Sequence, residues 1–211
     1  MVNGREVAKT EDKIEDIKRK LYMLTPLQRE ILDIFLKKKV SWTTHEIWTA
    51  LINEFFNRIM QAYSKVMSVR ENPYYKFTRD MDRDMDKLLE ELDFFPVELT
   101  ISRYLPPKNI TLKEIYFAQK EFQEKYKKAK SEKDILYCKL KFVRHFYRFP
   151  TVKKVEEVLN SLVCMGILST FTSTDKRVKN VYYIDPEFAE VYDEIKHKES
   201  KIKREKEDIS A

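Results

Sequence analysis

The sequence predicts a mainly α-helical fold with small β-hairpins, and three observations support that prediction. Only 2 of the 211 residues are Gly, whereas the tight turns of many-stranded β folds usually need Gly. Apolar residues recur at helical spacing along most of the chain. Strand-like segments are few and short, for example 97–101 and 181–184. The hydrophobic content of 43% allows a core for one large or two small domains.

Net charge and cysteine spacing indicate which partners and which cellular compartment to expect for this protein. The net charge of +6 suits a polyanionic partner such as nucleic acid, or simply keeps a Lys-rich protein in solution. No run of 18 apolar residues and no signal-peptide pattern occurs, so we expect no membrane association. Cys138 and Cys164 lie 26 positions apart without a partner motif, which is typical of a reducing, cytoplasmic compartment.

The first half of the chain predicts an N-terminal helical arm over 1–24 and a first unit over 25–105. The segments Thr25–Gln28 and Thr43–Glu46 match the capping box, so helices are expected to begin there, with a short strand near 40–42 between them. The arm carries one apolar stripe, formed by Ile14, Ile17, Leu21 and Leu24.

A helix predicted over 78–92 in this first unit is strongly acidic. Its carboxylates would repel DNA, so this unit is expected to pack or pair rather than read bases. The spacing does not fit a calcium-binding EF-hand loop, and neighbouring Arg and Lys side chains neutralise the charge, so we expect no metal. The acidic residues are Asp80, Asp82, Asp84 and Asp86.

Pro106-Pro107 is the best linker candidate, and a second unit is expected over 108–186. Capping residues predict helices from Thr111 to about 130 and from Ser131 onward, and a third over 151–165. Gly166 follows that third helix where a left-handed C-cap is required. Strands over 167–173 and 181–184, a basic turn between them, and a charged helical tail over 187–211 complete the chain.

Two parts of the chain resemble the winged helix-turn-helix family of DNA-binding domains. The segment FPTVKKVEEVLNSLVCMGILSTFTSTDKRVKNVYYIDP resembles its recognition helix and hairpin wing. The segment LTPLQREILDIFLKKKVSWTTHEIWTALI resembles its first helix, strand and second helix. The similarity of TTHEIWTA to TLKEIYFA favours two tandem units. In the alternative topology, helices 26–56 join the final helix and wing, and 60–148 are a large insertion.

The resemblance implies that the helix over 151–165 enters the major groove and that the hairpin tip reaches the backbone. Lys153 and Lys154 suit phosphate or guanine, and Asn160 suits adenine, whereas Glu156 and Glu157 repel phosphate. Charged residues at a hairpin tip also often serve only to keep a protein soluble. The expected DNA-contacting residues are Arg148, Thr151, Lys153, Lys154 and Asn160 in and before the helix, and Lys176, Arg177, Lys179 and Asn180 at the wing tip.

No catalytic or cofactor motif emerges. His45, His145 and His197 are scattered, with no zinc-ligand spacing, nucleophile elbow or kinase signature, so we expect no catalytic residues, no metal and no cofactor.

We therefore expect a non-enzymatic protein that binds double-stranded DNA, most simply a transcriptional regulator. Replication initiation or partition on a small replicon would use the same architecture. A protein-interaction scaffold built on winged helices is the alternative from another class, and it should expose an apolar patch instead of a basic face. A homodimer through the terminal helices is suggested by a seven-residue apolar spacing at Phe188, Ile195, Ile202 and Ile209.

Overall fold

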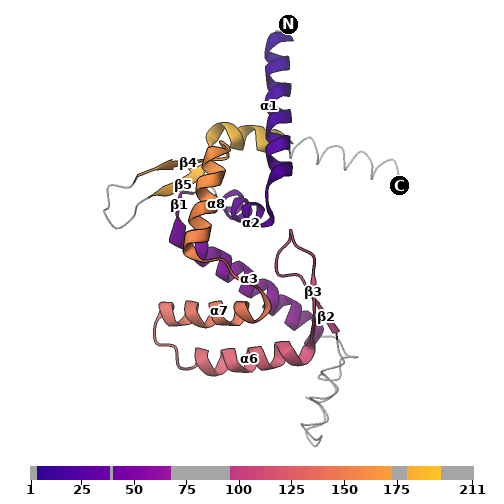
Figure 1. Cartoon of the computed structure of the whole chain (residues 1–211), viewed down its shortest axis with the longest axis vertical. Coiled ribbons are helices and arrows are strands. Elements are labelled where there is room, and N and C mark those ends of the chain that lie inside the picture. Colours follow the sequence, from indigo (N-terminus) through magenta and orange to yellow (C-terminus); the bar gives the residue numbers. More distant parts are fainter. Residues whose placement is uncertain (1–3, 39, 68–95, 173–179, 196–211) are drawn as a thin grey trace, which may run out of the picture. The chain divides into compact units, whose positions relative to one another are not determined.

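The computed structural model describes residues 4–38, 40–67, 96–172 and 180–195, and it is mainly helical with small antiparallel sheets, as predicted (Figure 1). None of the helices in these ranges has the length and apolar character needed to cross a membrane. The helices are α1 (Gly4–Met23), α2 (Pro26–Lys37), α3 (Thr44–Met67), α6 (Leu112–Tyr126), α7 (Glu132–Phe146), α8 (Val152–Cys164) and a last one over 186–195. The strands are β1 (Trp42–Thr43), β2 (Pro96–Leu99), β3 (Lys108–Thr111), β4 (Leu168–Phe171) and β5 (Val181–Ile184).

The chain forms two compact units. One, here called the split unit, comprises Met1–Ile47 together with Val152–Ala211, and the other, the inserted unit, is Trp48–Thr151. This division differs from the consecutive units expected over 25–105 and 108–186. Strands β4 and β5 and helix α8 group with α2 and β1, because β5 pairs with β1 and α8 packs on α2. The grouping resembles the alternative arrangement with an insertion over 60–148, but the inserted unit begins earlier, at Trp48, and so includes most of α3.

The split unit is organised around a three-stranded antiparallel sheet in the order β1-β5-β4. Strand β5 pairs on one side with β1, placing Trp42 opposite Tyr182, and on the other with β4, placing Leu168 opposite Ile184. Behind the sheet, the Nε2 of Gln28 on α2 donates to the hydroxyl of Ser161 on α8 at 3.1 Å. The last strand in sequence is therefore the central strand of this sheet.

Helix α8 leads into β4 through the predicted glycine cap. Gly166 has φ +68, and its N–H donates to the Val163 carbonyl at 2.9 Å. The next N–H, of Ile167, donates to the Leu162 carbonyl at 3.0 Å, which completes a Schellman motif. The chain thus reverses within two residues and delivers β4 to the sheet.

The terminal helices belong to the split unit. Ile14 and Ile17 of α1 are buried, and Lys13 forms an ion pair with Glu187 on helix 186–195. Phe188 and Ile195 are also buried, so these two positions of the seven-residue spacing do not form an exposed seam. The remaining two, and the acidic segment expected over 78–92, lie outside the described residues.

The inserted unit combines the rest of α3 with a β2–β3 hairpin and an α6–α7 helical hairpin, whose two helices lie side by side in Figure 1. Phe56, Phe122 and Phe142 meet in its core, with ring centroids 4.9 to 5.5 Å apart. The Trp48 indole N–H donates to the Pro150 carbonyl at 3.0 Å, so the two ends of this unit are adjacent.

Local start signals are confirmed, whereas one expected boundary differs. Reciprocal capping boxes occur at all four expected helix starts, which are Thr25, Thr43, Thr111 and Ser131. Asp185 likewise accepts from the N–H groups of Glu187 and Phe188 at 3.0 and 3.3 Å. Pro106-Pro107, the expected linker, instead lies in the loop between β2 and β3, and β3 itself was not foreseen.

The Gly166 cap generates a stability prediction. Replacing Gly166 by Ala should lower the free energy of unfolding by about 1 kcal/mol, because a Cβ disfavours positive φ. The nearest atom to that Cβ, the Lys20 ammonium at 3.8 Å, leaves room, so the cost is one of backbone conformation. Urea unfolding is the measurement. Gly166→Asn is the matched control and should lose less, since Asn tolerates this conformation; equal losses would contradict the explanation.

Candidate nucleic-acid interface

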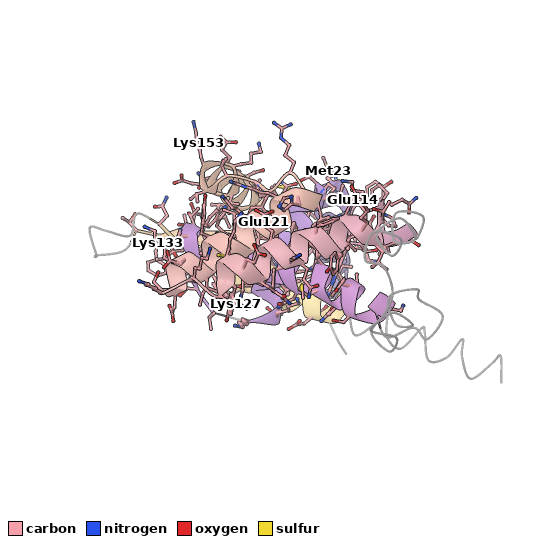
Figure 2. The ribbon with its side chains drawn as sticks, turned by 90° about the horizontal axis from the view of Figure 1, so that it is seen from below. Met23, Glu114, Glu121, Lys127, Lys133 and Lys153 are labelled. Atoms are coloured by element: carbon pink, nitrogen blue, oxygen red, sulfur yellow. The ribbon has the colours of Figure 1, made fainter. Side chains whose placement is uncertain are left out.

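Helix α8 has one buried face and one exposed face. Its buried side chains, Val155, Val158, Leu159 and Leu162, fill the core of the split unit. The opposite face exposes Lys153, Glu157, Asn160 and Cys164, at a spacing of four, three and four residues. Exposure of Cys164 differs from the small buried hydrophobe expected by default for a cysteine. The two lysines and Asn160 among the predicted site residues thus lie on one helix, and Lys153 is labelled in Figure 2.

Helix α8 carries less positive charge than a basic recognition helix requires. The helix carries two Lys and two Glu residues, so its side-chain charge is zero. The Lys154 ammonium lies 3.1 Å from the Glu157 carboxylate, with the two side chains 59% and 52% exposed. Such a surface pair adds little stability but offsets the charge of Lys154. Within the described part of the chain, Lys153 is the α8 cation without a partner.

Asn160 is held by the sheet behind it. The hydroxyl of the fully buried Tyr182 donates to the Asn160 Oδ1 at 3.0 Å. This bond fixes the amide so that its NH₂ group remains as the donor available to a ligand, together with one lone pair on Oδ1. Asn160 is therefore pre-oriented by a residue of β5, which sequence spacing did not indicate.

The remaining predicted residues lie elsewhere. Arg148 and Thr151 belong to the inserted unit; both are exposed, and Thr151 directly precedes α8. Asn180 directly precedes β5 and is half-buried. Three wing-tip residues, Lys176, Arg177 and Lys179, lie outside the described residues.

A large local excess of positive charge lies in a segment that the sequence analysis did not single out. Between Lys108 and Arg148 the chain has twelve Lys and Arg residues and five Asp and Glu residues, an excess of seven positive charges. This excess is larger than the net charge of +6 of the whole chain. Figure 2 looks onto this region and labels Glu114 near the beginning of α6 and Lys127 and Lys133 toward the opposite end of the hairpin.

The exposed face of α7 carries a row of cations. Lys133, Tyr137, Lys141 and Arg144 are all exposed and are spaced by four, four and three residues. Tyr137 is 55% exposed, and the Lys141 ammonium lies 5.1 Å from its ring centroid in a cation–π contact. The signal for this face, three cations and a tyrosine spaced by three or four residues on an amphipathic helix, was present in the sequence.

Carboxylates near this face are already engaged. Glu121 on α6 pairs with Lys125 and lies 3.3 Å from the His145 ring nitrogen, and the Lys125 hydrogen bond holds the Glu121 pKa below its usual value. Asp134 accepts from the Ser131 hydroxyl at 2.8 Å, which likewise lowers the pKa of Asp134. Both groups stay ionised at neutral pH, and the charge of Lys133 adds to the lowering of the Asp134 pKa.

Residue types that bind metals are scattered among the described residues. Among them, no three His, Cys, Asp or Glu side chains gather where they would hold a metal ion. His45 is exposed at the start of α3, and Cys138 is buried. In comparisons with known proteins, no family model, no curated protein and no solved structure matches this chain.

The Tyr182–Asn160 bond can be tested by removing one hydroxyl. Tyr182→Phe should lower the free energy of unfolding by about 1 kcal/mol, because a buried hydrogen bond is lost while the ring is kept. Tyr183→Phe is the matched control on the same strand and should change stability by less than about 0.5 kcal/mol. Chemical denaturation measures both, and equal effects would show that the hydroxyl of Tyr182 adds nothing specific.

Proposed function

We propose that the split unit is a winged helix-turn-helix domain and that the protein binds double-stranded DNA without catalysis. The observation that carries the proposal is the order of elements and strands. Helix α2, β1 and the start of α3 come first, then α8, β4 and β5, and the sheet has the order β1-β5-β4. In this interpretation α8 is the recognition helix, the β4–β5 hairpin is the wing, and the inserted unit separates the second helix from the third.

The exposed face of α8 supplies the groups for such a contact. Lys153 lies in the first turn, where free backbone N–H groups also favour a phosphate. Asn160 presents its NH₂ donor two turns further on, held in place by Tyr182. A helix of this size fits the major groove, where a directed amide distinguishes base edges. The neutral charge of α8 implies that it contributes orientation and base contacts more than affinity.

Transcriptional regulation is the role we favour. A protein that binds duplex DNA without catalysis acts by occupying its site on the DNA, and that is how a regulator works. A role in replication initiation or partition would rest on the same contacts. The scaffold alternative has its own support in the split unit. A groove of about 220 Å³, lined by Leu36, Val40, Tyr183 and Ile184 among others, has a mostly apolar wall, and Val40 is 56% exposed.

The proposal predicts salt-dependent binding to a random-sequence duplex. In fluorescence anisotropy, the logarithm of the affinity should fall linearly with the logarithm of salt concentration, with a slope of several units. Replacing Lys153 and Lys154 together by Gln should reduce the slope by roughly 1 to 2, since each phosphate contact contributes about 0.9.

The matched control removes two exposed cations elsewhere in the split unit. Lys18→Gln with Arg19→Gln lowers the net charge equally but lies on α1. A slope change as large as that of the α8 pair would mean that only net charge matters. Absence of binding at about 50 mM salt would refute DNA binding and favour the scaffold role.

A further inference from the structure

The inserted unit has a surface that the proposed winged helix does not use. The exposed face of α7, defined here as Lys133, Tyr137, Lys141 and Arg144, lies wholly within the inserted unit. At about 100° per residue, these four positions fall within roughly 80° of the helix circumference. Three cations and one aromatic ring thus form a single narrow row.

The length of this row matches a run of phosphates. Lys133 and Arg144 are eleven residues apart, which is about 16 Å along the helix axis. Because the row carries three cations, a phosphate backbone that runs along it can have up to three of its charges neutralised. A straight row of side chains on the outer surface of a helix can contact a phosphate backbone that runs alongside the helix.

The cations of the α7 face are available for a partner. Within the part of the chain that the structure describes, no ion pair joins a carboxylate to Lys141 or Arg144, and Lys133 interacts through its charge with the adjacent Asp134. Two nearby carboxylates are engaged, Glu121 with Lys125 and His145, and Asp134 with the start of α7, while the exposed Glu132 is next to Lys133 in the chain. Exposed Lys127 and Lys128, at the preceding turn, raise the positive potential of this end of the hairpin.

From this geometry we infer that the α7 face is a second nucleic-acid contact, which binds the phosphate backbone of duplex DNA independently of α8. The partner is identified by charge complementarity, since the segment 108–148 has an excess of seven positive charges. The Tyr137 hydroxyl is a further donor to a phosphate oxygen. The choice of DNA as partner rests on the proposed function, whereas the location of the surface does not.

The experiment uses the full chain, a random-sequence duplex and fluorescence anisotropy over a series of salt concentrations. The test variant combines Lys133→Gln, Lys141→Gln and Arg144→Gln. It should reduce the salt slope by roughly 2 to 3 and weaken binding about tenfold or more at 50 mM salt. All three side chains are exposed, so thermal unfolding should be unchanged, which separates lost contacts from lost folding.

The matched control, Lys18→Gln with Arg19→Gln and Lys108→Gln, removes three exposed cations that do not belong to α7. Its slope should change by less than about 1. An equal change in control and test variant would overturn the inference, because net charge alone would then explain binding. A single-strand arm uses Tyr137→Ala: a greater loss on single-stranded than on duplex DNA would indicate base stacking and overturn the duplex assignment.

The outcomes distinguish this inference from the proposed function. If wild-type protein binds the duplex and only the α8 variant weakens it, the inference is wrong and the winged-helix proposal stands. If only the α7 variant weakens it, the inference stands and α8 is not the contact. Additive losses support both surfaces. Absence of wild-type binding at 50 mM salt overturns both.

Discussion

The pairing of β5 with β1 is the constraint on which the split unit depends. It joins Trp42 to Tyr182 across most of the chain and makes β5 the central strand. The entropic cost of closing a loop grows only with the logarithm of its length, so a long insertion is tolerated there. The bond from the Trp48 indole to the Pro150 carbonyl holds the ends of the insertion together. The chain between β1 and β5 is therefore closed by a folded unit with adjacent ends rather than by an open loop.

The features that sequence reasoning predicted correctly are those that depend on neighbours within about five residues. A capping box needs a side chain and an amide three positions apart, and Thr25 and Thr111 satisfy that requirement in isolation. Gly166 is similarly local, because its left-handed backbone is required by the end of α8 whatever surrounds it. Helix type and helix starts were accordingly predictable without knowing the tertiary structure.

The grouping of elements was not predictable in this way. An amphipathic stripe shows that a helix is buried on one side but not which element covers it, so α8 was assigned to α6 and α7 instead of α2. The likeness of TTHEIWTA to TLKEIYFA reflects two capping boxes that each follow a short strand, β1 and β3. Strand β3 was not predicted because Ile110 is its only buried residue, so its sequence shows no alternation. It is a strand because it pairs with β2.

The two units differ in the charge of their exposed helix faces. Composition gives the sum of +6 but not its location, and the exposed face of α8 is neutral whereas that of α7 is a row of cations. Under the proposed function, α8 and the α7 face contribute different kinds of contact to DNA. A neutral helix with a directed amide at Asn160 discriminates through hydrogen bonds, which lose little to salt. The cationic face supplies phosphate contacts, whose strength comes from counterion release and is independent of sequence. If both proposals hold, the insertion adds affinity for DNA without altering the α8 surface that reads bases.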